Sequence, residues 1–242
     1  MGKLILVRHG HTPLNSPGAE ERLRAWLDVP LDKQGLREAE ETADKLVRHP
    51  IEVIYCSDLR RARRTAEVVR RRVKVPVVAT QELRPWNLGA FGGQKIREVI
   101  PFLELLNERP ELPAPGGESF DQFYERYSDR LRQLLALAEE TTGDVLAVTH
   151  VRNLLAATTI IEGGDRTKVP FKGGPSTGAI SIVEKFGGRW TIHRDDGRDV
   201  ADPSATLTSE EGPDEPAQQS SPRFGSLLRG MACDPAYGDG PA

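Results

Sequence analysis

The sequence predicts an α/β fold: a three-layer α/β/α sandwich around a mostly parallel central sheet. Short apolar runs rich in strand formers alternate along the chain with stretches in which apolar residues recur at helical spacing. The first apolar run begins almost at the first residue, which is typical of a central strand that is buried on both faces. This alternation continues to about position 195 and stops near position 200.

The first strand and the first helix come from the opening 50 residues. Residues 3–7 are apolar and rich in β-branched or aliphatic side chains, so we expect a buried strand there. Asp32 is a good N-cap residue, and apolar positions recur with helical spacing from about Lys33 to Val47. Pro50 then ends the helix.

A second strand and helix follow, and then a third strand. Residues 51–56 are predicted as a strand, and either Ser57 or Asp58 could cap the next helix, which runs to about Arg72. Residues 75–79 form the third strand, and the proline within them indicates a sheet edge or a strand start.

The second half of the chain alternates in the same way after a loop rich in glycine and proline at 81–94. The expected elements, in order, are a helix over 95–107, a rigid connector over 110–117, a long amphipathic helix over 120–138, a strand over 145–149, a helix over 153–161, and two strands over 179–184 and 190–193. The last two are joined by a glycine turn.

Composition separates the folded body from a tail. Two of the 33 basic and seven of the 36 acidic residues lie beyond position 200, which leaves the first 200 residues with a formal charge of +2. We therefore predict one domain over 1–199 and a disordered, acidic tail rich in proline, glycine and serine over 200–242. Of the two cysteines, Cys56 lies in an apolar run and is expected to be a buried thiol, and nothing suggests a disulfide framework.

Two histidines end two of the predicted strands, His9 after the first and His150 after the strand over 145–149. Ligands of open α/β sheets bind at the carboxyl ends of strands, so both imidazoles could face one pocket. Arg8 adds a fork of donors suited to phosphate oxygens, and Gly10 allows close backbone approach with an unshielded N–H. The pattern predicts an anion site; the alternatives are a basic surface loop at His9 and a hydrogen-bonded core histidine at His150.

A basic run begins the second predicted helix, where free N–H groups and the helix dipole favour anions. The run contains Arg60, Arg61, Arg63 and Arg64. At about 100° per residue these cannot all face one site, and Ala62 and Ala66 mark the buried side, so at least two must be solvated. A nucleic-acid patch is the rival interpretation, but no aromatic residues are interleaved with the arginines.

Taken together, these stretches resemble the histidine phosphatase superfamily in its phosphoglycerate mutase-like branch. Four segments match the family's motifs in the expected order: Arg8–Asn15, Ser57–Ala66, Pro115–Ser119 and Val145–His150. In the second segment an aspartate stands where the family has a proline. The resemblance covers roughly residues 3–195 and implies the phosphate-binding arginine to be the one at position 61.

The resemblance also implies a mechanism. His9, as a neutral imidazole, would attack phosphorus in line and form a phosphohistidine that water then hydrolyses. Arg8, Arg61 and His150 would stabilise the equatorial oxygens during both steps. Because the arginines supply the positive charge, the scheme needs no metal and no other cofactor.

The sequence departs from the family where the proton donor for the leaving group is usually found. The corresponding block runs from Leu83 to Gly89, and the acid position falls on Pro85, which cannot donate a proton. Glu82 is the first substitute that we predict, and Glu118 is the second. A positioned acid contributes about 10²–10⁴-fold to the rate, so its loss would matter most for alkyl phosphates.

Three further residues are predicted to contact the substrate. Gly10 and Asn15 belong to the first motif. Arg152, two residues after the second histidine, could bind a second negatively charged group of the substrate; the alternative is a solvated arginine. A metal bound between His9 and His11 would lack a third ligand, so no metal site is predicted.

We therefore predict a metal-independent phosphatase, cytoplasmic and monomeric or homodimeric, that acts on a small phosphomonoester or a phosphorylated protein side chain. The alternatives are a phosphoglycerate-type mutase, disfavoured because the body is compact, and a catalytically weak phosphate-binding module. Neither a nucleic-acid nor a membrane partner is expected. No apolar run approaches the roughly 20 residues that span a bilayer, and the N-terminus does not resemble a signal peptide.

Overall fold

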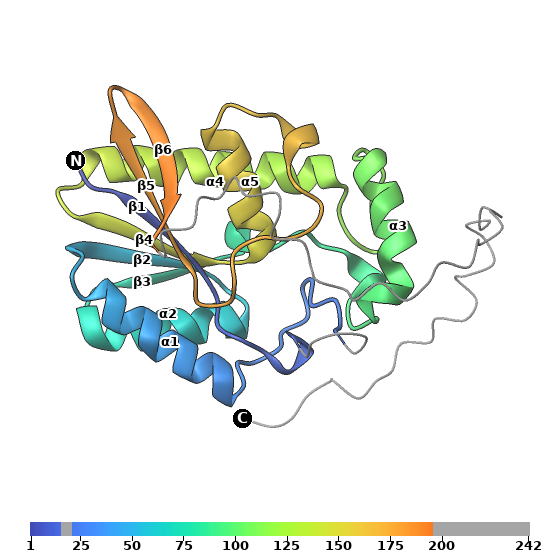
Figure 1. Ribbon diagram of the computed structural model, residues 1–242, viewed down its shortest axis with the longest axis horizontal. Helices are drawn as coiled ribbons and strands as arrows, with labels where there is room; N and C mark the ends of the chain where they lie inside the picture. Colours follow the sequence, from blue (N-terminus) through green and yellow to red (C-terminus); the bar gives the residue numbers. More distant parts are fainter. Residues whose placement is uncertain (16–20, 196–242) are drawn as a thin grey trace, which may run out of the picture. The chain divides into compact units, whose positions relative to one another are not determined.

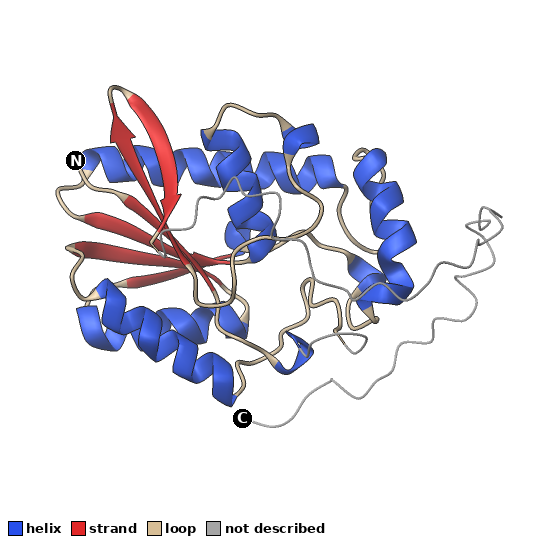
Figure 2. Ribbon diagram, in the orientation of Figure 1, coloured by secondary structure: helices blue, strands red, loops and turns tan. Residues whose placement is uncertain are grey.

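A computed structural model describes residues 1–15 and 21–195 of the chain. They form a six-stranded sheet in the order β3-β2-β4-β1-β5-β6 (Figure 2). The strands are β1 (Leu4–Arg8), β2 (Ile51–Ser57), β3 (Val77–Thr80), β4 (Asp144–Thr149), β5 (Ile180–Phe186) and β6 (Arg189–Arg194).

The first four strands of that order are parallel to their neighbours. β1 pairs with β4, β4 with β2, and β2 with β3, all in parallel. The last two strands form an antiparallel hairpin, and β5 runs antiparallel to β1. The predicted mostly parallel sheet is confirmed, and β3, which directly follows Pro76, is an edge strand as expected.

Helices cover both faces of the sheet. They are α1 (Lys33–Leu46), α2 (Arg60–Val73), α3 (Ile96–Glu108), α4 (Phe120–Glu140) and α5 (Val151–Ile161). Helices α1 and α2 pack together on one face, whereas α4 and α5 lie on the other (Figure 1). The three-layer sandwich is therefore confirmed, with α3 standing beside the layers.

The core explains why β1 is apolar without alternation. Both of its faces are covered, so Leu4 to Val7 are all fully buried. On the α1–α2 side the contacts are made largely by small side chains, among them Ala39, Ala43 and Ala62, which let the helices lie close to the sheet. Cys56 is buried in β2 as predicted, and burial raises the pKa of its thiol to about 12.

One predicted cap is wrong. The N-cap of α2 is Leu59, which makes no side-chain cap hydrogen bond, rather than Ser57 or Asp58. The Asp58 carboxylate instead accepts two hydrogen bonds of 2.6 Å from Arg84. Asp32 does cap α1, accepting a hydrogen bond from the Gly35 N–H.

The tail predicted from position 200 lies outside the described residues. Within 1–15 and 21–195, no helix is both long and apolar enough to cross a bilayer.

Candidate active site

The two predicted histidines meet at the carboxyl edge of the sheet. β1 and β4 pair in parallel with Arg8 opposite Thr149, so His9 and His150 are the next residues on two adjacent strands. Their ring centroids are 5.0 Å apart, with 62° between the ring planes. Both side chains are buried, each with 2% exposure. The sequence predicted that these two imidazoles would meet at the ends of two strands, and the structure brings them together.

A backbone contact sets the tautomer of His9. Its Nδ1 lies 2.7 Å from the carbonyl oxygen of Gly10. A carbonyl oxygen can only accept, so Nδ1 carries the proton and donates, which leaves the lone pair on Nε2. Burial, followed by the positive charges of Arg61 and Arg8, holds the pKa of His9 well below its usual value. His9 is therefore a neutral imidazole with a free nucleophilic nitrogen at neutral pH.

His150 is also held neutral, and it lacks partners. Burial, then the charge of Arg61, lowers its pKa well below the usual value. Neither ring nitrogen has a hydrogen-bond partner among the described residues, although both are buried. Buried polar atoms are nearly always satisfied, so an unpaired imidazole beside His9 points to a ligand group that belongs there.

Arg61 is the buried cation of the site. It lies in the first turn of α2 with 1% exposure, and its guanidinium donates to the carbonyl oxygens of Leu27 at 2.6 Å and Ala25 at 2.8 Å. Ala25 adopts a φ of +39°, which is rare for a residue with a side chain. Burial lowers the pKa of Arg61 to about 9, so the group remains charged at neutral pH.

Arg8 contributes a second guanidinium, which is part-buried. One of its terminal nitrogens donates to the carbonyl oxygen of Pro175. Burial, reinforced by the charge of Arg24, lowers its pKa to about 10, and it too stays charged. The Nε atoms of Arg8 and Arg61 are buried and lack partners among the described residues, as do both ring nitrogens of His150. Four unsatisfied polar atoms on three neighbouring site residues fit a bound polar ligand.

Arg24 is a third guanidinium at the site, and the sequence argument missed it. Its charge acts on both histidines and on Arg8 and Arg61. The side chain is 13% exposed, donates to the carbonyl oxygen of Leu14 at 3.1 Å, and has Glu21 at 3.7 Å. No periodicity or motif marked this residue, because it comes from an irregular segment between β1 and α1.

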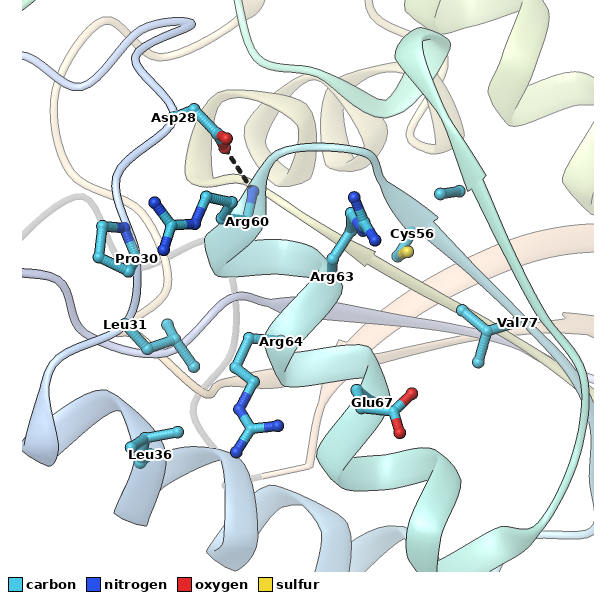
Figure 3. A pocket seen from close by; sticks show the side chains of 11 residues that line it. Asp28, Pro30, Leu31, Leu36, Cys56, Arg60, Arg63, Arg64, Glu67 and Val77 are labelled. Carbon is cyan, nitrogen blue, oxygen red and sulfur yellow. Dashed lines mark hydrogen bonds between the residues drawn. The ribbon is translucent and has the colours of Figure 1, made fainter. Parts of the chain in front are cut away.

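The other arginines of the basic run face away from the histidines. Arg60, Arg63 and Arg64 are exposed and line a groove of about 890 Å³ on the outer side of α2 (Figure 3). That groove includes neither histidine. The expectation that at least two of these arginines are solvated is therefore confirmed.

Gly10 serves a different purpose from the one predicted. Its N–H is not unshielded but donates to Thr65 Oγ1 at 3.2 Å. A Cβ on Gly10 would lie 2.4 Å from the carbonyl oxygen of Gly35, and one on Gly35 would lie 2.0 Å from that of His11. The two glycines allow α1 to touch the loop that follows β1, which fixes the loop carrying His9.

The remaining residues of the first motif are tied to their own loop. Asn15 Oδ1 accepts hydrogen bonds from both the N–H and the hydroxyl of Thr12. His11 Nδ1 lies 2.6 Å from a carboxylate oxygen of Asp32, the N-cap of α1. Among the described residues, no cluster of three or more His, Cys, Asp or Glu side chains could hold a metal ion.

Arg152 is part-buried and is bound by backbone carbonyls and aromatic rings. Its guanidinium donates to the carbonyl oxygens of Pro170 and Phe171, and it packs over the rings of Trp86, Phe120 and Phe171.

Among the described residues, neither of the two predicted acids makes a hydrogen bond or an ion pair with His9 or His150. Glu82 is exposed in a short 3₁₀ turn, where its backbone carbonyl accepts from Arg126. The Glu118 carboxylate binds the Arg126 guanidinium at 2.6 Å and accepts from the Asn87 N–H. The positive charges of Arg61, Arg8 and Arg24 all lower the pKa of both histidines.

A buried histidine pair among guanidiniums at the edge of an α/β sandwich fits proteins that handle phosphoryl groups, and comparison with known families agrees. The chain belongs to the histidine phosphatase superfamily (branch 1), whose family model matches residues 4–196.

Relatives of known name are phosphatases and mutases. Phosphoglycerate mutase-like protein 4 of Arabidopsis thaliana is 31% identical over 157 residues, which cover 61% of this chain and 66% of the relative. The metal-independent phosphoserine phosphatase of the same plant is 31% identical over 157 residues, or 61% and 63% of the two chains. The uncharacterized phosphatase PhoE of Bacillus subtilis is 29% identical over 167 residues, or 68% and 80%. The chain spans just under two thirds of the length of the two plant relatives.

Solved structures share the fold. A mycobacterial glucosyl-3-phosphoglycerate phosphatase in complex with VO3 matches with a TM-score of 0.68 and 25% identity, over 81% of this chain and 98% of that one. YhfR of Bacillus stearothermophilus matches with a TM-score of 0.67 and 26% identity, over 81% and 96%.

Proposed function

We propose that this protein is a metal-independent phosphatase that hydrolyses phosphomonoesters through a phosphohistidine intermediate on His9. One observation carries the proposal. The ring centroid of a neutral His9, whose proton is held on Nδ1 by the Gly10 carbonyl, lies 5.0 Å from that of a neutral His150, and the His150 nitrogens have no partner among the described residues. The substrate is a small phosphate ester or a phosphorylated protein side chain.

The reaction has two transfers. In the first, Nε2 of His9 attacks phosphorus, the N–P bond forms and the P–O bond to the leaving group breaks. In the second, water attacks the same phosphorus and the N–P bond breaks, which releases phosphate and returns the lone pair to the imidazole. The lowered pKa of His9 keeps the nucleophile unprotonated at neutral pH without a separate base.

The surrounding cations stabilise the charge that develops on phosphorus. The unpaired Nε atoms of Arg8 and Arg61 and the unpaired nitrogens of His150 are the donors available to the equatorial oxygens. A proton on His150 becomes favourable when an anion enters, because the anion offsets the arginines that depress its pKa. The guanidiniums are fixed by backbone carbonyls before the substrate arrives, so little reorganisation is needed.

A second function, a catalytically weak phosphate-binding module, is favoured by one specific observation. Pro85 occupies the position where the resemblance places the proton donor, and the Glu118 carboxylate is bound by the Arg126 guanidinium. Such a module would bind phosphate tightly and turn over very little.

The test is hydrolysis of p-nitrophenyl phosphate together with detection of a covalent phosphoenzyme. We expect the wild type to release phosphate and to carry an acid-labile, base-stable phosphoryl group after rapid quenching. His9→Ala should remove both signals, because no other nucleophile replaces the ring. His193→Ala is the matched control, since His193 lies on the edge strand β6 and its side chain is 45% exposed.

The outcomes separate the three functions. Equal background rates for the wild type and His9→Ala, with tight binding of inorganic phosphate, would establish the binding module instead. Conversion of one phosphoglycerate isomer into the other without release of phosphate would establish a mutase. Loss of both signals in His9→Ala but not in His193→Ala supports the proposed hydrolysis.

A further inference from the structure

The site combines a surplus of positive charge with a lack of acid. Pro85 occupies the position where a proton donor was expected, and Trp26 Nε1–H donates to its carbonyl oxygen. Glu118 is held by Arg126, and Glu82 is exposed. An alkoxide leaving group needs a proton in the transition state, and a positioned acid supplies about 10²–10⁴-fold in rate. Pro85 has no proton to donate, and the two other candidate acids are exposed at Glu82 and paired with Arg126 at Glu118.

Arg24 provides positive charge beyond the Arg8–Arg61 pair. Its side chain reaches the carbonyl oxygen of Leu14, in the loop that follows the nucleophile. The next residue, Ala25, gives its carbonyl oxygen to the Arg61 guanidinium. Arg24 thus lies between the two segments that hold the site, and its nearest carboxylate, Glu21, is 3.7 Å away and part-exposed. Two fixed guanidiniums already suit one phosphoryl group, so a third suits a second anionic group.

We propose that the preferred substrates are phosphoanhydrides, in which the terminal phosphoryl group is transferred to His9 and the leaving group is itself a phosphate bound by Arg24. This inference rests on the proposed function and narrows its substrate class. A phosphate leaving group has a second pKa of about 6, so it departs as an anion and needs no proton from the protein. The missing acid and the additional arginine then have one common explanation.

The step balances without an added reactant. Nε2 of His9 forms a bond to the terminal phosphorus, and the bridging oxygen keeps both electrons of the broken P–O bond. The shortened phosphate leaves as an anion opposite the Arg24 guanidinium. Water then forms the new P–O bond as the N–P bond breaks, and its surplus proton goes to the solvent or to the released phosphate.

The experiment compares kcat/KM of the full chain for three probes: ADP, p-nitrophenyl phosphate and β-glycerophosphate. We expect ADP to exceed β-glycerophosphate by about 10²-fold or more, because only the alkyl ester needs the absent acid. Arg24→Gln should lower kcat/KM for ADP by about 10²-fold, the usual loss when one charge-stabilising donor is removed. The rate with p-nitrophenyl phosphate should fall far less, since its leaving group carries no second phosphate.

Two further variants keep the result interpretable. Arg37→Gln, an exposed position on α1, is the charge-matched control and should leave all three rates unchanged. Arg24→Lys retains the charge and should recover part of the ADP rate. Phosphoenzyme formation from p-nitrophenyl phosphate shows that the Arg24→Gln site is folded.

Failure of this inference differs from failure of the proposed function. If β-glycerophosphate is turned over as fast as ADP, an acid exists and the anhydride preference is wrong. An equal loss on all three probes in Arg24→Gln also overturns it. If no probe is hydrolysed and His9 is never labelled, the proposed function itself is wrong.

Discussion

Arg61 shows how one side chain can be both structural and functional. Its guanidinium is almost fully buried and is held by two carbonyl oxygens, those of Ala25 and Leu27, rather than by a carboxylate. Carbonyl acceptors orient the group and carry no formal charge of their own, so the guanidinium keeps its positive charge. The charge therefore remains available to an incoming anion.

We predict that Arg61→Lys destabilises the protein and nearly abolishes hydrolysis. An ammonium is a point donor and cannot reach both carbonyls as the planar fork does. The carbonyl that loses its partner costs about 1–3 kcal/mol of unfolding free energy. The rate with p-nitrophenyl phosphate should fall about 10²–10³-fold.

Thermal unfolding and initial rates check this prediction, with Arg63→Lys as the control on the same helix. Arg63 is exposed and lines the outer groove, so its substitution should change neither quantity. An Arg61→Lys protein with wild-type melting temperature and rate would show that the two carbonyl contacts are unimportant.

Among single residues, those tied to regular elements could be predicted from the sequence. His9 and His150 each follow an apolar strand. Because ligands of open α/β sheets bind at the carboxyl ends of strands, the sequence predicted that these two side chains lie together. Arg24 could not be found in this way, because its position depends on an irregular segment that includes Ala25 at φ +39°. Arg152 was predicted to face the substrate, but its aromatic contacts come from residues distant in sequence.

At the scale of elements, the contact between α1 and the loop after β1 is the tightest link to the site. Gly10 and Gly35 touch backbone to backbone, with no room for a side chain on either. The N–H of His11 also donates to Glu38 on the same helix. The position of the helix thus determines where the loop carries His9.

We predict that Gly35→Ala is destabilising even though alanine favours helices by about 1 kcal/mol over glycine. The new Cβ would lie 2.0 Å from the carbonyl oxygen and 2.7 Å from the nitrogen of His11, both of them backbone atoms. Relieving that overlap moves α1 away from the loop and costs about 1–3 kcal/mol. The phosphatase rate should fall as well, because His9 moves with the loop.

Denaturant unfolding and kcat/KM report both effects, and Gln34→Ala, the exposed neighbour on α1, serves as the control. A Gly35→Ala protein that gains stability would mean that the helix and loop can separate without cost.

The element boundaries followed closely from hydrophobic period and cap chemistry, and the exceptions have a physical cause. Asp58 was predicted as a possible cap for α2, a local role, but it binds Arg84, 26 residues further on. Arg84 also lies 4.5 Å from the Trp26 ring centroid, so three segments meet there. Local propensity cannot reveal such a competition, because the rival partner is brought in only by the fold.

For the whole molecule, two buried neutral histidines make stability depend on pH. Their folded-state pKa values lie well below the unfolded value of about 6.5, so the unfolded chain binds more protons below that pH. Above pH 6.5 this pair therefore does not make the free energy of unfolding depend on pH. The free energy of unfolding falls as the pH drops below 6.5. Two such sites give a slope approaching about 2.7 kcal/mol per pH unit.

We predict that His150→Asn removes about half of that slope, near 1.4 kcal/mol per pH unit, between pH 6 and 5. Urea unfolding across this range measures it, and this window avoids the carboxylates with lowered pKa values, which titrate below about 4.5. A wild-type protein with constant stability from pH 7 to pH 5 would contradict the burial of neutral imidazoles.

The sandwich and its mostly parallel sheet were predictable because every element carried its own pattern. The strand order was not, because nothing local specifies that β4 inserts between β2 and β1. The family match ends at residue 196, and the predicted end of the domain at 199 and the predicted tail lie outside the described residues.

The parallel pairing of β1 with β4 makes the spacing of the two histidines a property of the backbone. Neighbouring strands are always about 4.8 Å apart, and a slip of one residue would turn an imidazole to the opposite face. The strand spacing therefore fixes the distance between the two imidazoles. Loop sequences can diverge and admit new substrates while this distance stays constant. Substrate specificity can then change during evolution while the geometry of the two imidazoles is retained.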